Sequence, residues 1–233
     1  MLIIVIFVII NIYFFMQNQM TIKHVCFDLD GTLINSFDTI LESTLKALDH
    51  LEIENSIDEK EFYNRIGLHF EDIFNELNVS VPDVEHFIKV FKGYYFDFID
   101  KSEMYPNVIE TIKYLNENNI SVTLLTTKAQ DQADKIIDLF GLRPYFKFVM
   151  GRRVGLEIKP SPEPLLFICN DLKILPENTL MVGDSELDIR CGKSAGTYTA
   201  AAAYGYRSEE VIAAENPDFT LSNIKELIAI VKV

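Results

Sequence analysis

Two aspartates that stand two residues apart are the first residues in this chain that could do chemistry. Asp28 and Asp30 directly follow a short apolar and β-branched run at residues 22–27. If the strand geometry of that run continues, both carboxylates project to the same side at its tip. At a separation of about 4 Å the two charges would repel by about 4 kcal/mol at an effective dielectric near 20. The pair therefore needs a cation, or one of its carboxyl groups must stay protonated.

Other polar residues also stand where apolar runs end. Thr126 and Lys128 come at the end of residues 120–126, Asp184 follows residues 179–182, and Lys159 stands in a loop. In an open parallel sheet, ligands collect at the carboxyl ends of the strands. With Asp184 as a third acid at that edge, the aspartates favour binding of a hard divalent cation that prefers oxygen ligands. Mg²⁺ is the first candidate.

The sequence Asp-Leu-Asp-Gly-Thr at residues 28–32 can also be read as a simple turn, because Asp and Gly are turn residues. The order along the chain argues against that interpretation. An acid pair, a threonine, a lysine and an acid cluster follow one another, each at the end or in the loop of a successive unit. Gly31 would relieve crowding where the chain leaves the first strand.

The elements that must position these residues alternate along the second half of the chain. Repeated strand and helix patterns predict an α/β fold, a doubly wound and mostly parallel, Rossmann-like sheet with helices on both faces. The predicted strands are residues 22–27, 120–126, 146–150, 179–182 and 197–203, and the predicted helices are residues 106–118, 129–140, 162–172, 185–195 and 223–231.

About ninety residues separate the first predicted strand from the second, far more than the dozen or so that a crossover needs. Residues 36–51 and 83–100 have apolar side chains at helical spacing, and no convincing strand precedes residue 120. The excess therefore predicts an inserted all-helical cap at residues 37–104, with residues 21–36 and 105–233 forming the catalytic core.

The first twenty residues are set apart from this fold. Residues 1–16 are apolar except for Asn11 and carry no charge, and a helix of that length would span about 24 Å, short of the bilayer core. No Lys or Arg precedes Lys23, so a secretory signal is poorly matched. We interpret residues 1–20 as a misplaced start before Met20 or as an extension of the fold. A membrane anchor through residues 1–16 is the less favoured interpretation.

Composition excludes some classes of protein. The chain of 233 residues has 21 Lys and Arg against 35 Asp and Glu, a net charge of −14, which argues against a nucleic-acid partner. The three cysteines are widely spaced, so they offer no disulfide framework and indicate a reducing, cytoplasmic compartment. Cys26 and Cys191 are expected to be packing thiols, and the four histidines have no metal-binding spacing.

Taken together, the motifs resemble those of the haloacid dehalogenase-like hydrolase superfamily, in its phosphoglycolate phosphatase-like branch with a helical cap. The resemblance extends from residue 21 to about residue 231. It rests on FDLDGTL at residues 27–33, LLT at 124–126, KPSPEP at 159–164 and VGDSELD at 182–188, with YGY at 204–206 and Pro217-Asp218 as further similarities.

The resemblance implies a role for each motif residue. Asp28 would be the nucleophile that forms an aspartyl-phosphate, and Asp30 would protonate the leaving alkoxide and then take a proton from water. Mg²⁺ would be held by Asp28, the Asp30 backbone carbonyl and Asp184. Thr126 and Lys159 would grip the oxygens of the transferring phosphate, an electrostatic task.

Four further residues are assigned expected roles, some with an alternative. Asp188 is expected in a supporting role at the metal, or else as a solvated acid at a helix start. Lys128 is expected to be a surface charge at a helix entry and not a ligand of the phosphate. Arg65, in a helix-breaking loop of the cap, would meet a substrate carboxylate or remain a solvated surface residue. Thr127, counted with the substrate-binding residues, stands where the branch usually has Asn, as Asn35 stands where Asp is common.

The predicted function is Mg²⁺-dependent hydrolysis of a small phosphorylated metabolite, phosphoglycolate or a similar phosphomonoester, by a monomer or homodimer. A pyrophosphatase or a phosphosugar mutase has the same motifs, so both stay open. A dehalogenase is disfavoured, because that chemistry does not use an acid at the position of Asp30. The alternative from another class is a catalytically silent, membrane-associated binding protein. The presence of all the motif acids and of Lys159 argues against it.

Overall fold

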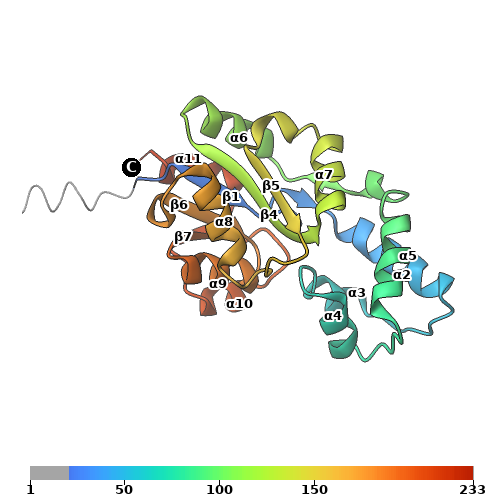
Figure 1. The fold of residues 1–233 in the computed structure, drawn as a ribbon. Helices are drawn as coiled ribbons and strands as arrows, with labels where there is room; N and C mark the ends of the chain where they lie inside the picture. The colour runs from blue at the N-terminus through green and yellow to red at the C-terminus, as the bar shows by residue number, and fades with distance from the viewer. Residues whose placement is uncertain (1–20, 233) are drawn as a thin grey trace, which may run out of the picture.

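The computed structural model of the protein describes residues 21–232, so the predictions for residues 1–20 lie outside the described residues. A single six-stranded parallel sheet forms the core, in the order β5-β4-β1-β6-β7-β8. Figure 1 shows the sheet with its helices, and the cap helices grouped to one side. The strands are β1 (His24–Phe27), β4 (Ser121–Ala129), β5 (Phe148–Arg152), β6 (Thr179–Gly183), β7 (Tyr198–Ala202) and β8 (Phe219–Leu221).

β1 occupies the centre of this sheet. It pairs with β4 on one side and with β6 on the other, and His24 is in register with both Ser121 and Thr179. The chain builds outward from β1 through β4 and β5, and then returns to build the other half from β6. Such a reversal of strand order creates a crevice at the carboxyl ends of the central strands, where ligands of α/β proteins bind.

Helices cover both faces of the sheet. Side chains alternate along β1, with Val25 and Phe27 in one apolar cluster and Cys26 in the other, as a strand buried on both faces requires. The helices α6 (Val108–Glu117), α7 (Gln130–Leu139) and α11 (Leu227–Ile230) pack on the first face, and α8 (Glu163–Leu172) and α9 (Glu186–Ala195) pack on the second. The predicted α/β fold with helices on both faces is confirmed.

The cap is helical, as predicted. Its elements are α2 (Phe37–His50), α3 (Glu59–Tyr63), α4 (Phe70–Glu76), α5 (Val84–Tyr95) and the 3₁₀ turn η1 (Ile99–Lys101). The rings of Phe70, Phe74, Phe87 and Phe91 contact one another between α4 and α5, with centroids 4.7–6.2 Å apart. These aromatic side chains of α4 and α5 are therefore part of the core of the cap.

Some local predictions were wrong. Residue 120 is preceded by two short strands, β2 (Ile34–Asn35) and β3 (Glu103–Met104), which pair antiparallel where the chain enters and leaves the cap. Two residues are too few to show an alternating pattern. The strand β8 and the helix α10 (Glu209–Ala214) were not predicted, and the last predicted helix divides into the turn η4 (Ile224–Glu226) and the single turn of α11.

The remaining 3₁₀ turns are η2 (Arg143–Tyr145) and η3 (Pro176–Asn178). Across residues 21–232, none of the helices has the length and apolar character needed to cross a membrane.

Candidate active site

Asp28 is held at the carboxyl end of β1 by the sheet itself. Its backbone N–H donates to the carbonyl of Val182, which continues the β1–β6 ladder one residue past the strand. The carboxylate Oδ1 lies 2.8 Å from the Lys159 Nζ, and the residue is only 8% exposed. Burial raises the pKa of Asp28 to about 7, against the opposing charge of Lys159 and with help from the neighbouring Asp188.

Asp28, Asp184 and Asp188 form a buried acidic cluster. Each offers one carboxylate oxygen, and these oxygens all lie within 4.8 Å of one another. Burial raises the pKa of Asp184 well above its ordinary value, and the charges of Asp28 and Asp188 raise it further. Three buried acids so close together are stabilised by a cation, and hard oxygen ligands fit Mg²⁺. The donor set is therefore suited to the predicted ion, with the Asp30 side chain outside it.

Lys159 provides one positive charge to this cluster. Its Nζ lies 2.8 Å from Asp28 Oδ1 and 2.6 Å from Asp188 Oδ1, and the side chain is buried. Burial alone would lower the pKa of Lys159, but the charges of Asp188 and Asp28 outweigh burial and raise it. The amine is thus held as a cation beside Asp28.

Asp188 is fully buried, so the alternative of a solvated acid at a helix start is wrong. Its second oxygen accepts hydrogen bonds from the backbone N–H and the hydroxyl of Ser185, at 3.1 and 2.6 Å, and the bond from the N–H belongs to the capping box of α9. One oxygen caps the helix while the other meets Lys159, so Asp188 fixes the lysine as well as the helix start.

The turn after β1 fits closely around Asp184. Gly31 has a φ of 78°, and a Cβ added to it would lie 2.2 Å from Asp184 Oδ2, so only glycine fits there. The Thr32 hydroxyl donates to Asp184 Oδ1 at 3.2 Å, and the Tyr206 N–H donates to Oδ2 at 2.9 Å. The loop from the first motif thus packs directly against the acid of the last motif.

Asp30 points away from the acidic cluster toward the cap. Its carboxylate accepts a hydrogen bond from the Ser36 hydroxyl and lies 3.2 Å from the Lys128 Nζ. Lys128 in turn lies over the Tyr95 ring of the cap, 4.3 Å from its centroid. Both groups that hold the Asp30 carboxylate therefore belong to the core, and the cap contributes indirectly through Tyr95, which contacts Lys128.

The prediction that Lys128 is a surface charge was wrong. The side chain is 10% exposed and lies between Asp30 and Tyr95. Burial lowers the pKa of Lys128, but the nearby charge of Asp30 and the contact with Tyr95 outweigh it and raise the pKa overall. Burial also raises the pKa of Tyr95 to about 12, so its hydroxyl stays protonated at neutral pH.

The two threonines at the end of β4 have different surroundings. Thr126 is buried, and its hydroxyl accepts a hydrogen bond from the Lys128 N–H at 3.3 Å. Thr127 donates instead to the Gly67 carbonyl of the cap at 3.4 Å. Thr127 therefore contacts the cap loop that faces the core.

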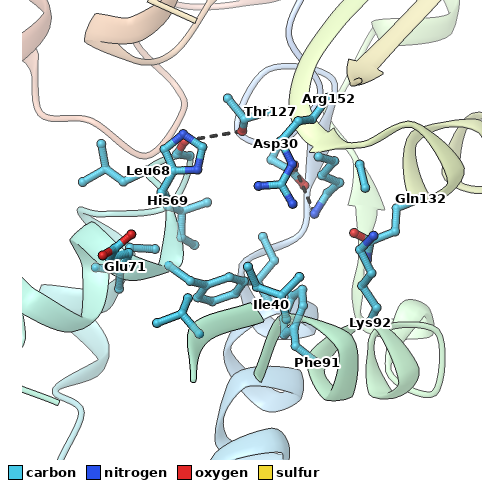
Figure 2. A pocket seen from close by; sticks show the side chains of 18 of the residues that line it. Asp30, Ile40, Leu68, His69, Glu71, Phe91, Lys92, Thr127, Gln132 and Arg152 are labelled. Carbon is cyan, nitrogen blue, oxygen red and sulfur yellow. Dashed lines mark hydrogen bonds and ion pairs between the residues drawn. The ribbon is translucent and has the colours of Figure 1, made fainter. Parts of the chain in front are cut away.

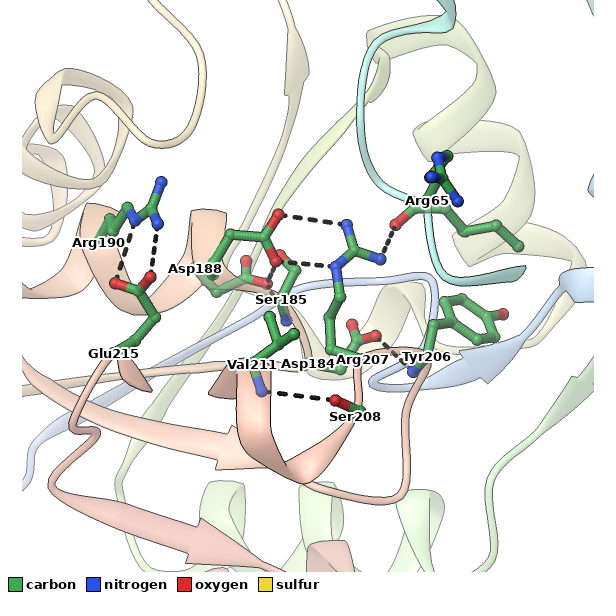
Figure 3. A network of polar contacts seen from close by, with 12 residues as sticks. Arg65, Asp184, Ser185, Asp188, Arg190, Tyr206, Arg207, Ser208, Val211 and Glu215 are labelled. Atoms are coloured by element: carbon green, nitrogen blue, oxygen red, sulfur yellow. Dashed lines mark hydrogen bonds and ion pairs between the residues drawn. The ribbon is translucent and has the colours of Figure 1, made fainter. Parts of the chain in front are cut away.

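A second contact between cap and core is centred on Arg207, as Figure 3 shows. Its Nη1 donates to the Ile66 carbonyl of the cap at 2.8 Å, while its Nε donates to Glu186 Oε2 of the core at 2.8 Å. Nearby, the Tyr63 hydroxyl donates to the Gly205 carbonyl at 3.3 Å. These contacts hold the cap loop against the core beside the acidic cluster.

Arg65 is not brought to the acidic cluster. Its guanidinium pairs with Glu61 Oε2 at 2.8 Å and with Glu76 Oε2 at 2.9 Å, both within the cap. The residues that follow it, Ile66, Gly67 and Leu68, do reach the space between cap and core. The loop is therefore in position, whereas the arginine is engaged elsewhere.

A cavity lies between the cap and the core on the Asp30 side of the site, as Figure 2 shows. Asp30 is one of the residues that line it and Asp28 is not. The core side of the cavity is polar and the cap side is largely apolar. The core contributes Asp30, Thr127, Lys128, Gln132 and Arg152, and the apolar cap residues are Ile40, Ile66, Leu68, Phe70, Ile73, Val84, Ile88 and Phe91.

Comparison with known proteins agrees with this geometry. Residues 25–202 match the family model of haloacid dehalogenase-like hydrolases. The matched range contains the site residues Asp28, Asp30, Lys159, Asp184 and Asp188. The chain belongs to this family.

The hydrolase has curated relatives along almost its whole length. It is 35% identical to the pyrophosphatase PpaX of Halalkalibacterium halodurans over 216 residues, which cover 92% of this chain and 99% of the relative. It is 33% identical to the pyrophosphatase PpaX of Bacillus pumilus over the same length and coverage.

Solved structures support the same fold. A predicted phosphoglycolate phosphatase from Haemophilus somnus is 27% identical, with a TM-score of 0.77 over 90% of this chain and 97% of that one. A putative phosphatase from Clostridium difficile is 25% identical, with a TM-score of 0.78 over 91% of this chain and 100% of that one. The hydrolase is thus similar, along most of its length, to proteins named as phosphatases and pyrophosphatases.

Three residues that surround the site of the hydrolase were not predicted from the sequence. Arg207 and Tyr95 reach it only through contacts between the cap and the core, which no local pattern reveals. Arg152 follows the predicted strand at residues 146–150, so the position at a strand end that singled out Thr126 could have identified it as well.

Proposed function

We propose that this hydrolase is a Mg²⁺-dependent phosphohydrolase that forms an aspartyl-phosphate on Asp28, with inorganic pyrophosphate as its first candidate substrate. The observation that carries the proposal is the Lys159 Nζ, which lies 2.8 Å from the Asp28 carboxylate inside a buried acidic cluster. A carboxylate so placed is unprotonated at mildly alkaline pH, since the pKa of Asp28 is about 7, and it can act as a nucleophile.

The residues around Asp28 suit phosphoryl transfer. An oxygen of Asp28 attacks phosphorus, and the bond from phosphorus to the leaving group breaks as the new bond forms. Lys159, beside Asp28, and Thr126, on the neighbouring strand β4, would hold the oxygens of the transferring group, and their contribution would be electrostatic. Mg²⁺ held by Asp28, Asp184 and the Asp30 carbonyl, with Asp188 beside them, would offset the repulsion between the carboxylate and the phosphate.

Asp30 suits the two proton transfers that complete the reaction. It lines the cavity on the leaving-group side, and Ser36 and Lys128 hold its carboxylate in place. A protonated Asp30 would give its proton to the departing group, a phosphate from pyrophosphate or an alkoxide from a phosphomonoester. The resulting carboxylate would take a proton from the water that attacks the phosphorus of the aspartyl-phosphate. Water then releases phosphate and restores Asp28.

The names of similar proteins rank the substrates. The two curated relatives at 35% and 33% identity are called pyrophosphatase, which favours pyrophosphate. A solved structure at 27% identity is called a predicted phosphoglycolate phosphatase, which makes 2-phosphoglycolate the second candidate. Both candidates have a phosphoryl group to transfer and a second negatively charged group.

The test is phosphate release from pyrophosphate and from 2-phosphoglycolate, with Mg²⁺ and with EDTA. We expect release with Mg²⁺ that EDTA abolishes, and an Asp28→Asn variant whose kcat is lower by about 10⁴-fold or more, as expected when a nucleophile is removed. Acid-quenched wild type should carry one phosphoryl group, detectable by mass spectrometry, and Asp28→Asn should not.

Asp171→Asn is the matched control, because it makes the same chemical change at an exposed position of α8. Its activity should equal that of the wild type. Release that persists in Asp28→Asn would show that Asp28 is not the nucleophile. Isomerisation of a sugar phosphate without release of phosphate would favour the mutase instead.

A further inference from the structure

Arg152 stands at the edge of the sheet where the site is built. It is the last residue of β5 and is in register with Ala129, the last residue of β4, so it lies beside the strand that carries Thr126 and Lys128. The residue before it is tightly fixed. The Gly151 N–H donates to Gln130 Oε1 at 2.8 Å, and a Cβ on Gly151 would lie 2.7 Å from the Gln130 backbone. Arg152 therefore starts from a rigid position.

The guanidinium of Arg152 has no partner among the described residues, whether a hydrogen bond, an ion pair or a ring contact. Figure 2 shows the side chain pointing into the cavity beside Asp30. Asp30 is already engaged by Ser36 and Lys128. A guanidinium has five N–H donors, and leaving them unpaired in a partly buried position is unfavourable. The position suits an anion that enters the cavity.

The neighbouring Arg153 has the contacts of an arginine with a structural role. Arg153 donates through Nε to Gln130 Oε1 at 2.8 Å and through Nη2 to the Val149 carbonyl at 3.2 Å. Its guanidinium also lies 5.2 Å from the centroid of the Phe148 ring. Arg153 is therefore held by the protein, whereas its neighbour Arg152 has donors to offer to a ligand.

We infer that Arg152 binds a second anionic group on the leaving-group side of the substrate, a phosphate or a carboxylate. The inference rests on the proposed function. Asp30 lines the cavity and Asp28 does not, so the cavity is where the leaving group would lie while phosphorus is attacked at Asp28. The planar guanidinium can bind either kind of anion through two parallel hydrogen bonds. Arg152 thus takes the substrate-binding role that the sequence analysis gave to Arg65.

The test compares substrates that have and lack the second anion. Pyrophosphate and 2-phosphoglycolate carry a phosphate and a carboxylate there, and p-nitrophenyl phosphate carries an uncharged ring. For Arg152→Gln, we expect kcat/KM for the anionic substrates, divided by that for p-nitrophenyl phosphate, to fall about 10- to 100-fold, which corresponds to the loss of a charge-assisted hydrogen bond. Arg152→Lys should recover part of the loss.

Arg153→Gln is the matched control, because it removes the same charge one residue away and should leave this ratio unchanged. A ratio that also stays unchanged in Arg152→Gln, or that falls equally in both variants, would overturn the inference. The substrate with the larger fall identifies whether Arg152 meets a phosphate or a carboxylate. If wild type hydrolyses none of the three substrates, the proposed function fails, which is a separate outcome.

A binding measurement on wild type keeps the inference testable if Arg152→Gln does not fold. Calorimetry with Mg²⁺ present would compare methylenediphosphonate, which has a second phosphonate, with methylphosphonate, which has none. We expect the first to bind about 10-fold or more tightly than the second at equal pH and ionic strength. Equal affinities would count against an anion site in the cavity.

Discussion

The two ends of β1 bury ionisable side chains in opposite ways. At the amino end, His24 is fully buried, with its ring nitrogens 3.1 Å from the Thr179 hydroxyl and 2.7 Å from the Thr123 hydroxyl. Thr179 donates its own proton to the Leu175 carbonyl, so it accepts from the histidine Nδ1–H, and Thr123 donates to Nε2. Burial lowers the pKa of His24 to about 3, so the ring is neutral.

At the carboxyl end of β1, charged groups are kept together, whereas His24 at the amino end is neutral. Burial raises the pKa of Asp28 to about 7, and Lys159 and a fitting cation site are gathered around the carboxylate. The difference separates two uses of burial within one short strand. Neutral, hydrogen-bonded groups at one end stabilise the sheet, while the other end keeps costly charges close together, as reactive sites do.

The largest expected effect on stability comes from removing the buried cation. Lys159→Met would leave Asp28 and Asp188 facing each other without Lys159, and breaking such a buried pair lowers the free energy of unfolding by about 3–5 kcal/mol. Urea unfolding at pH 8 in EDTA measures the change. The deficit should shrink at pH 5.5, because the unpaired carboxyl groups take up protons.

Lys46→Met is the control for that variant, since Lys46 forms an exposed ion pair with Asp49. Exposed pairs of this kind contribute little, so no measurable change is expected. Equal stability of Lys159→Met and wild type at pH 8 would mean that the lysine does not offset the buried acids.

The pH dependence of stability tests the amino end of β1. The unfolded chain protonates His24 below its ordinary pKa of about 6.5, whereas the folded protein does so only near pH 3. Stability due to this residue is therefore fully present above pH 6.5 and is lost as the pH falls, by about 1.4 kcal/mol per pH unit. At pH 5 the loss should be about 2 kcal/mol.

Comparing wild type with His24→Asn isolates this contribution, because Asp28, whose pKa is raised, acts in the opposite direction over the same range. Between pH 7.5 and pH 5, wild type should lose about 2 kcal/mol more than His24→Asn in urea unfolding. His86→Asn, on an exposed part of α5, should follow wild type. Parallel pH profiles for wild type and His24→Asn would show that the buried ring does not stay neutral.

The smallest effect concerns one hydroxyl at that end. Thr123→Val removes the donor to His24 Nε2 and leaves a buried acceptor unpaired, which should cost about 1–2 kcal/mol. Thr111→Val is a sharp control, because the buried Thr111 hydroxyl has no hydrogen-bond partner within the described residues, so its removal should be neutral or stabilising. Chemical denaturation at pH 7.5 distinguishes them. Equal destabilisation of both variants would argue that lost packing, not the hydrogen bond, is responsible.

Much of the fold could be predicted because its signals are local. The buried strands and amphipathic helices of the core each have a pattern within ten residues or so, and their alternation leads to a parallel sheet. The large gap between the first two strands then revealed the cap. β2 and β3 could not be predicted, because a pair of two-residue strands is defined by its partner and not by its own sequence.

The site also contains residues that could be predicted from the sequence and residues that could not. Asp28, Lys159, Asp184 and Asp188 stand in recognisable motifs, and the structure brings these four together. The surroundings of Lys128 depend on Tyr95 from the distant cap, so its burial could not be predicted from neighbours in sequence. Arg152 and Arg153 are adjacent and chemically identical, and only packing against Gln130 and Phe148 distinguishes their roles.

The short strands at the base of the cap have a consequence for how such a chain can change over time. Ile34 and Met104 are register partners, so the inserted segment leaves and rejoins the core at neighbouring points. Because the inserted segment enters and leaves the core at one place, it adds little to the entropy cost of folding the core. Recombination at this junction could exchange the whole lid while β1 and its reaction centre stay intact, which would let new specificities evolve on old chemistry.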